Sequence, residues 1–356
     1  MVRIAHLTLW IGLIGMISAC EQKPPASNSP PGNPRTTSAA TAADAATPET
    51  AVAEKPAESA AAAGKKFAVI PKGTTHVFWR SVEAGAKKAG EELGVEIVWK
   101  GPLKENDRAE QIKVVQQFTT QKVDGIVLAP LDFKALIEPV KAARAQGIPV
   151  VIFDSALDGQ PGTDFVSFVA TNNEQGGYIG GAALAKLLGD KGNVVLLRYM
   201  VGSASTDQRE AGFVKALGEH PEIKILVDNR YSGATAGDAK TQSLNLIEQL
   251  RQADGVFAPN ESSTMGMLLA LRQEGLAGKI KFVGFDASPP LVAALEAGEI
   301  DALVVQNPRK MGYEAVKTLA AHIAGRPIEP VIDTGVALVT RENMNEPEIK
   351  ALIAAD

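Results

Sequence analysis

Cysteine and histidine are both scarce in this 356-residue chain. The single cysteine, Cys20, excludes an internal disulfide and a structural zinc site built from several cysteines. The four histidines, His6, His76, His220 and His322, lie far apart, so the sequence predicts no metal site. Blocks rich in lysine and arginine are also missing, and the formal net charge is -5. Because phosphate binding needs concentrated positive charge, this composition argues against a nucleic-acid partner.

The remaining composition is that of a soluble globular protein. Hydrophobic residues make up 45% of the chain and charged residues 22%. These proportions exclude a wholly disordered chain and a membrane protein with several spans. A length of 356 residues favours two domains over one small module.

Residues 1–20 have the layout of a secretory signal. A cation, Arg3, precedes an apolar run over residues 7–17, which is too short to span a membrane stably. The segment ends in Ile-Ser-Ala-Cys, and this ending resembles the lipobox of bacterial lipoproteins, whose cysteine is acylated. The resemblance implies a signal peptide over residues 1–19 and a lipid anchor at Cys20. An ordinary cleaved signal with an incidental cysteine is the alternative.

Residues 20–64 are dominated by alanine, proline, serine, threonine and glutamate, with no aromatic residue and no apolar period. Such a segment cannot bury enough surface to fold. We expect a disordered tether that holds a folded part away from a membrane, although the alanine-rich residues 58–63 could form a transient helix.

After residue 65, short β-branched runs alternate with longer amphipathic stretches. The expected strands cover residues 67–70, 96–99, 125–129, 149–153, 193–197, 223–227, 255–258 and 280–284. The expected helices cover residues 81–93, 109–121, 133–146, 208–217, 240–251 and 265–274. Strands that alternate with helices of this length predict an α/β fold with parallel sheets.

The two halves of this region repeat one another. Asp-Gly-Ile-Val-Leu-Ala-Pro at residues 124–130 matches Asp-Gly-Val-Phe-Ala-Pro at residues 254–259, and each motif is followed by a strand that ends in an aspartate, Asp154 or Asp286. Two matched pairs in the same order predict two similar lobes. Because ligands of open parallel sheets bind outside the carboxyl ends of the strands, both aspartates would line one cleft.

The side chains expected at these strand ends combine planar polar groups with aromatic rings. Carboxylates and amides pair with vicinal hydroxyls, and an aromatic face covers the C–H surface of a sugar ring. The set therefore predicts a monosaccharide or polyol ligand. Helix capping is the alternative for any one aspartate or asparagine, but the matched pair of aspartates weakens it. The set comprises Lys72, His76, Phe78, Trp79, Asp154, Asn172 or Asn173, Asn260, Asp286 and Gln306.

The region from residue 65 onward resembles the periplasmic sugar-binding proteins of ABC transporters, the type I group that includes ribose-, galactose- and allose-binding proteins and shares its fold with the lactose-repressor effector domain. The resemblance rests on short motifs in order: Phe78-Trp79, Asp-Gly-Ile-Val-Leu-Ala-Pro, Ile-Pro-Val-Val-Ile-Phe-Asp154, Arg209-Glu-Ala-Gly-Phe, Pro-Asn260-Glu, Val-Gly-Phe-Asp286 and Val-Gln306-Asn-Pro. It implies two Rossmann-like lobes joined by a hinge of crossover strands. The first lobe would comprise residues 65–171 with 307–335, and the second residues 172–306 with 336–356.

The resemblance also implies which residues contact the ligand. The first lobe would contribute His76, Phe78, Trp79 and Asp154, and the second lobe and hinge would contribute Asn173, residues 207–209, Asn260, Asp286 and Gln306.

Departures from the ribose-binding pattern bear on specificity. Lys72 stands where ribose binders carry a serine, and Ser155 replaces an arginine. Lys72 could meet the carboxylate or phosphate of an acidic sugar, or it could be a solvated lysine at the rim. Asp207 aligns better than Arg209 with a ligand-contacting arginine of the family, so Arg209 has either a ligand contact or a structural pairing. For His76, a hydrogen-bonding or stacking role is favoured over metal binding.

The resemblance implies a binding protein rather than an enzyme. Two carboxylates across a cleft also serve glycoside hydrolysis, but here the lobes match them and nothing in the sequence separates their pKa values. Gly-x-Ser-x-Gly, Gly-x-Gly-x-x-Gly and Walker motifs are missing. We expect a monomeric clamp without cofactor or metal, in the periplasm or at the cell surface, that delivers a sugar to an ABC transporter permease. A sensor that feeds a chemoreceptor or histidine kinase is the alternative.

Overall fold

The computed structural model describes residues 57–354, so Cys20 and the predicted signal peptide lie outside the described residues. The strands are β1 (Lys66–Ile70), β2 (Glu96–Trp99), β3 (Gly125–Leu128), β4 (Val150–Phe153), β5 (Phe168–Ala170), β6 (Lys191–Arg198), β7 (Glu222–Tyr231), β8 (Gly255–Phe257), β9 (Lys281–Phe285), β10 (Ala302–Gln306), β11 (Val331–Asp333) and β12 (Val336–Thr340). The helices are α1 (Ala57–Ala62), α2 (Val77–Leu93), α3 (Arg108–Thr120), α4 (Ile137–Ala145), α5 (Asn173–Leu188), α6 (Ala204–Leu217), α7 (Ala236–Leu244), α8 (Ile247–Leu250), α9 (Glu261–Gln273), α10 (Pro289–Glu296), α11 (Pro308–Ile323) and α12 (Pro347–Ile353).

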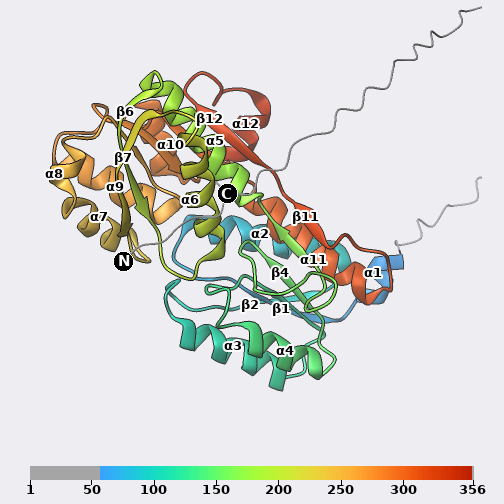
Figure 1. Ribbon diagram of the computed structural model, residues 1–356. Helices are drawn as coiled ribbons and strands as arrows, with labels where there is room; N and C mark the ends of the chain where they lie inside the picture. The colour runs from blue at the N-terminus through green and yellow to red at the C-terminus, as the bar shows by residue number, and fades with distance from the viewer. Residues whose placement is uncertain (1–56, 355–356) are drawn as a thin grey trace, which may run out of the picture. The chain divides into compact units, whose positions relative to one another are not determined.

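Two six-stranded sheets carry the fold (Figure 1). The first has the order β11-β5-β4-β3-β1-β2, with every pairing parallel. The second has the order β12-β10-β9-β8-β6-β7, in which only β12 is antiparallel to its neighbour. The predicted α/β fold with two similar lobes is confirmed. We call the first sheet with α1–α4 and α11 the first lobe, and the second sheet with α5–α10 and α12 the second lobe.

The central strands are buried on both faces, which explains their continuous apolar sequences. Alternate residues of the first sheet enter different cores: Val127 and Val151 pack with α2 and α11, whereas Ile126 and Ile152 pack with α3 and α4. Figure 1 shows these helix pairs on opposite sides of the sheet. The strand ends are therefore the part of the sheet that can meet a ligand.

Glycines let one helix pair in each lobe approach closely. A Cβ on Gly85 of α2 would lie 1.9 Å from a backbone carbonyl oxygen of α11, and Gly312 of α11 is equally confined against α2. In the second lobe, Gly177 of α5 and Gly212 of α6 have the same relation to each other's helix. The glycine-rich start of α5 therefore serves packing.

The chain passes between the two sheets three times. It leaves the first sheet after β5, returns after β10, and crosses again between β11 and β12. The third passage is short, because Asp333 ends β11 and Val336 begins β12. No helix among residues 57–354 is long and apolar enough to cross a membrane.

Two expectations about local structure are wrong. Residues 57–62, predicted as part of a disordered tether, form α1, and Ala62 is fully buried in the core that α2 and α11 share. The predicted helix over residues 240–251 is divided into α7 and α8, because the Leu246 N–H donates to the Ser243 carbonyl in a tighter turn. Residues 63–64 form a turn, and residues 20–56 of the predicted tether lie outside the described residues.

Candidate functional site

Two aspartates occupy equivalent positions in the lobes. Asp154 directly follows β4, and Asp286 directly follows β9. Both have a left-handed backbone, with φ of 61° and 68°, which is uncommon outside glycine. Both are buried, with exposed fractions of 2% and 7%. The repeat in the sequence therefore extends to the backbone conformation at the carboxyl ends of two strands.

Lys72 lies inside the molecule. It is only 5% exposed, and its Nζ lies 3.0 Å from Asp154 Oδ2 and donates to Ser205 Oγ at 3.1 Å. The alternative of a solvated lysine at the rim is therefore wrong. A buried ammonium needs an opposite charge, and Asp154 supplies it from the same lobe.

The first turn of α2 supplies the aromatic surface of the site. Trp79 is 2% exposed and meets two rings edge-on, with centroid distances of 5.0 Å to Phe78 and 6.2 Å to Phe153. Because α2 begins at Val77 rather than at the predicted residue 81, both aromatic side chains of the Phe78-Trp79 pair belong to the helix. Packing against these two rings fixes the indole in place.

Glu105 forms the centre of a buried network that sequence reasoning missed. It lies between β2 and α3 and is 4% exposed. Its Oε1 accepts from Trp79 Nε1 at 2.8 Å and lies 2.8 Å from His76 Nδ1. Its Oε2 accepts from Tyr199 Oη of the second lobe at 2.9 Å. Polar residues directly after a strand are the predicted candidates for the site. Glu105 is not among them, because it lies in the loop well past the end of β2.

His76 and Glu105 shift each other's pKa in opposite directions. Burial lowers the pKa of His76, but the carboxylates of Glu105 and Glu261 and the hydrogen bond to the Ala234 carbonyl together raise that pKa to about 9. Burial raises the pKa of Glu105, but His76 and Lys72 hold it well below its usual range. His76 is therefore protonated at neutral pH, and its Nε2 donates to the Ala234 carbonyl of the second lobe at 3.2 Å.

Arg209 of α6 is held rigidly inside the second lobe. Its Nε donates to Asn173 Oδ1 at 2.8 Å, and its Nη1 donates to the Pro259 carbonyl at 2.9 Å. The guanidinium carbon lies 4.0 Å from the centre of the Phe285 ring. Burial lowers the pKa of Arg209, while the carboxylates of Asp286 and Asp154 act in the opposite direction. The side chain remains a cation, because an arginine is not deprotonated inside a protein.

Asp286 connects the second lobe to the hinge. Its Oδ1 accepts from Gln306 Nε2 at 2.7 Å, and its Oδ2 accepts from the Glu261 N–H at 2.9 Å. Gln306 Oε1 in turn accepts from Thr171 Oγ1 at 3.1 Å. Burial raises the pKa of Asp286, and Arg209 counteracts that rise.

Glu261 and its neighbour Asn260 begin α9. Asn260 is the N-cap and forms a capping box with Ser263. The Glu261 carboxylate points to the first lobe, where it accepts from the Val77 and Phe78 N–H groups at 3.1 and 2.8 Å. Burial raises the pKa of Glu261. The Glu261 side chain is not among the residues predicted for the site.

One pocket between the lobes gathers most of the predicted residues. Nine of the predicted residues line it, together with Glu105, Thr206 and Glu261, which sequence reasoning missed. The nine are Lys72, His76, Phe78, Trp79, Asp154, Arg209, Asn260, Asp286 and Gln306. Its volume is about 20 Å³, which is on the scale of a water site rather than of a sugar ring. The lobes must therefore separate to admit a monosaccharide.

Ser155 and Asn173 lie behind this pocket. Ser155 is fully buried, and its Oγ accepts from the Ser205 N–H of the second lobe at 3.2 Å. Asn173 is 2% exposed and orients Arg209 through the bond already described. Both side chains therefore support the lining rather than form it.

Asp207 also lies outside the lining. Thr206 and Arg209 are three residues apart and share one face of α6, whereas Asp207 follows Thr206 by one position and is turned away from that face. Asp207 is half-buried, and burial raises its pKa although Arg198 opposes the rise. Arg209, which aligned less well with the family's arginine, is the one that reaches the pocket.

Direct contacts join the two lobes around this pocket. They link Lys72 to Ser205, His76 to Ala234, Glu105 to Tyr199, Ser155 to Ser205, Val77 and Phe78 to Glu261, Arg108 to Val201 and Phe133 to Gly202. Several of these residues also line the pocket, so the same side chains shape the site and hold the lobes together.

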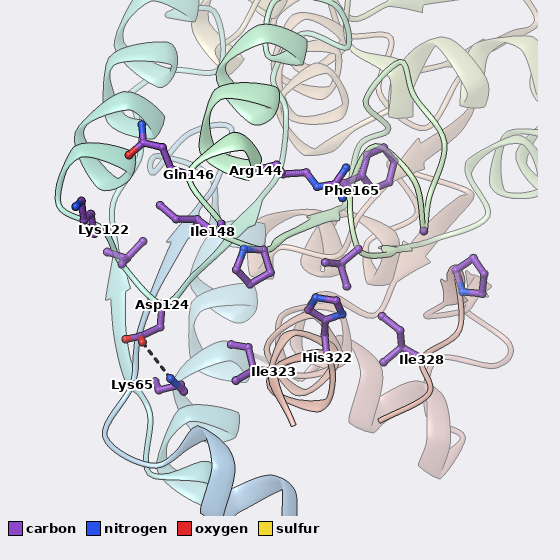
Figure 2. Close-up of a pocket in the computed structure, with 16 residues that line it drawn as sticks. Lys65, Lys122, Asp124, Arg144, Gln146, Ile148, Phe165, His322, Ile323 and Ile328 are labelled. Atoms are coloured by element: carbon purple, nitrogen blue, oxygen red, sulfur yellow. Dashed lines mark hydrogen bonds and ion pairs between the residues drawn. The ribbon is translucent and has the colours of Figure 1, made fainter. Parts of the chain in front are cut away.

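A much larger cavity, about 1050 Å³, lies in the first lobe (Figure 2). Lys65 and Asp124, which form an ion pair at 3.2 Å, border it, as do His322 and Ile323 at the end of α11. Its lining residues precede the strands, at the edge opposite to Asp154. None of the predicted ligand contacts lines it, so size alone does not identify the ligand site. Among the described residues, no cluster of His, Asp and Glu could hold a metal ion.

The sequence is similar to those of known proteins. The family model for the periplasmic binding protein domain matches residues 67–327. The D-ribose/D-allose-binding protein of Pseudomonas aeruginosa is 30% identical over 285 residues, which cover 77% of this chain and 88% of the relative.

Two solved structures are also similar. The periplasmic component of an ABC-type sugar transport system from Hahella chejuensis is 39% identical, with a TM-score of 0.74, and the match covers 78% of this chain and 100% of that one. A carbohydrate transporter solute-binding protein from Agrobacterium radiobacter, in complex with D-arabinose, is 35% identical, with a TM-score of 0.77 and coverage of 82% and 99%.

Proposed function

Because this chain belongs to the periplasmic binding protein family, we propose that it captures a neutral monosaccharide or polyol between its lobes and passes it to the permease of an ABC transporter. The family and the relatives are substrate-binding proteins and not enzymes. The observation that carries the proposal is the pocket at the strand ends of both sheets. There the Phe78 and Trp79 rings adjoin the carboxylates of Asp154 and Asp286.

The charges of the pocket support a neutral ligand. Lys72 is paired with Asp154 at 3.0 Å, and His76 is paired with Glu105 at 2.8 Å. The Asp286 carboxylate acts on Arg209 from within the same lobe. The lining holds four carboxyl groups against the three cations Lys72, His76 and Arg209, so no cation is in excess to compensate a sugar acid or sugar phosphate. Lys72 thus orients Asp154 rather than selecting an acidic sugar.

A thermal-shift screen tests this proposal, because a ligand that binds only the folded protein raises its melting temperature. The full chain carrying Cys20→Ser is screened against neutral pentoses, hexoses and polyols, and against uronic acids and sugar phosphates. We expect one neutral sugar or a few to raise the melting temperature, and Asp286→Asn to abolish the rise. A rise in melting temperature with the acidic compounds alone would contradict the proposal of a neutral ligand. No rise with any compound of the panel would contradict sugar capture.

We also propose that Cys20 carries a lipid anchor. We propose further that residues 65–171 with 307–335, together with α1, form the first lobe and that residues 172–306 with 336–356 form the second. The Ile-Ser-Ala-Cys ending supports the anchor. The pairing of β11 with the first sheet and of β12 with the second supports the boundaries. The protein would act as a tethered monomer on the outer side of a membrane.

The anchor predicts where a cysteine variant is found. Cys20→Ser removes the only thiol in the chain that can be acylated, so the protein should move from the membrane fraction to the soluble exported fraction. Fractionation and immunoblotting measure this, with Ser18→Ala as a control that keeps the cysteine. A Cys20→Ser protein that stays with the membranes would exclude the lipid anchor.

A further inference from the structure

Helix α2 begins without a cap from its own lobe. Its N-cap residue is His76, whose side chain makes no capping hydrogen bond, and its first turn contains no acidic residue. The imidazole is directed instead to Glu105 and to the Ala234 carbonyl. The first N–H groups of a helix have no partner within the helix and need an outside acceptor, so a helix of 17 residues with such a start requires one.

The acceptor comes from the opposite lobe. Glu261 Oε2 accepts from the Phe78 N–H at 2.8 Å, and Oε1 accepts from the Val77 N–H at 3.1 Å. The residue is 9% exposed, so solvent screens these bonds little. A carboxylate at a helix N-terminus is favoured both by the free N–H groups and by the helix dipole.

The Glu261 backbone is fixed by the ligand site. Its N–H donates to Asp286 Oδ2 at 2.9 Å, and Asp286 Oδ1 accepts from Gln306 Nε2 at 2.7 Å. Asn260, directly before it, caps α9 and lines the pocket. The carboxylate is therefore presented from a rigid helix start, and it can reach α2 only when the lobes are close together.

We infer that Glu261 is a positioning residue, a latch that caps α2 across the cleft and thereby favours the closed arrangement of the lobes before any sugar contributes. The inference rests on the proposed function in that the lobes separate to admit a sugar. Capping also fixes the start of α2, and with it the rings of Phe78 and Trp79 on the pocket. When the lobes separate, the Val77 and Phe78 N–H groups lose the Glu261 carboxylate and donate to water instead.

Energy transfer between dyes on the two lobes tests the latch. The full chain with Cys20→Ser receives cysteines at two exposed helix positions, Lys113→Cys on α3 and Glu248→Cys on α8. Transfer is measured without sugar, and then during titration with the sugar found in the thermal-shift screen. The variants are Glu261→Ala, which removes the acceptor, and Glu261→Gln, which keeps one neutral acceptor oxygen. Asp124→Ala is the matched control, since Asp124 accepts from the Lys66 N–H at 2.8 Å within the first lobe.

Without sugar, we expect Glu261→Ala to shift the transfer toward separated lobes, Glu261→Gln to lie between it and the parent, and Asp124→Ala to match the parent. The sugar dissociation constant of Glu261→Ala should rise about fivefold, mainly through faster dissociation. Equal transfer in Glu261→Ala and the parent, or an equal decrease in Asp124→Ala, would overturn the latch. Because the first comparison contains no sugar, it stands even if no sugar binds, and a failure of sugar capture is thus told apart from a failure of the latch.

Discussion

Lys72 and Asp154 form an ion pair with almost no access to solvent, at 6% and 3% side-chain exposure. Removal of one partner leaves the other as a buried unpaired charge, which costs about 3 kcal/mol. We therefore expect Lys72→Met to lower the free energy of unfolding by about that amount, and the double variant Lys72→Met with Asp154→Asn to recover most of it. Urea denaturation measures both changes.

Stability and ligand binding should separate in these variants. The double variant regains stability but lacks the Asp154 carboxylate, so its sugar affinity should stay low. Lys141→Met is the control, because Lys141 pairs with Glu138 on an exposed helix surface and its loss should change stability by less than about 0.5 kcal/mol. A single Lys72→Met variant as stable as the parent would contradict the buried pair.

His76 makes the stability of the fold depend on pH. Its pKa is raised from 6.5 to about 9 in the folded protein, with Glu105 and Glu261 as the carboxylates that face it. Folding therefore gains from the protonated imidazole, and this gain is fully present below pH 6.5 and is lost as the pH rises to about 9. We expect the free energy of unfolding to fall across this interval and His76→Gln to flatten the fall. Denaturation curves at several pH values measure it.

Glu210 provides the internal comparison for that experiment. Burial raises its pKa to about 7, with Arg198 opposing the rise, so its own loss of stability with rising pH lies mostly below the interval of His76. Glu210→Gln should therefore change the dependence of unfolding free energy on pH between 4.5 and about 7. His76→Gln should change that dependence above pH 7. Parallel profiles of His76→Gln and the parent above pH 7 would show that His76 does not carry the effect.

At the scale of elements, the sequence predicts those whose evidence is local. The strands that contain Val127 and Val151 are predicted correctly, because both of their faces are buried and their residues are therefore continuously apolar. Helix α5 is missing from the predicted helices, and the close approach of α6 to Gly177 shows that the glycines of this helix serve its packing. Local propensity and tertiary packing conflict there, and packing prevails.

The start of α2 shows the same limit at the candidate site. The predicted helix begins at residue 81, whereas α2 begins at Val77, and the side chain of the N-cap residue His76 makes no capping hydrogen bond. The cap is Glu261, which lies far along the chain in the other lobe. Glu105 was missed for a related reason, since its partners Trp79 and Tyr199 meet it only after the lobes have folded. Residues at strand ends follow from the pattern, whereas contacts across the cleft do not.

The crossing of α2 and α11 gives a prediction at this scale. A Cβ on Gly312 would lie 2.1 Å from a carbonyl oxygen of α2, so Gly312→Ala must push the two helices apart. We expect a loss of about 1–3 kcal/mol in the free energy of unfolding. Gly237→Ala in α7 is the matched control: its nearest neighbour would be 3.8 Å away, and alanine favours a helix, so stability should not fall. Equal stability of the two variants would contradict the close crossing.

For the whole molecule, the small pocket volume makes opening of the lobes a condition for exchange of the ligand. At about 20 Å³, the pocket cannot admit a sugar unless the lobes move apart, and a bound sugar leaves by the same route. Tyr199 makes one of these contacts, with its Oη 2.9 Å from Glu105 Oε2 at a fully buried position. Burial raises the pKa of Tyr199 further above its usual value, so the phenol stays protonated and remains a donor.

Tyr199→Phe removes that one bond across the cleft and keeps the ring. Glu105 retains Trp79 and His76 as partners, so the first lobe should keep its structure while the closed arrangement loses about 1 kcal/mol. We therefore expect the sugar to dissociate roughly fivefold faster, with little change in the association rate. Stopped-flow tryptophan fluorescence follows both rates, because Trp79 lines the pocket. Tyr178→Phe is the control, since its hydroxyl bonds Glu219 at 2.9 Å on the surface of the second lobe alone. If both tyrosine variants release the sugar at the parent's rate, contacts between the lobes do not set the lifetime of the closed complex.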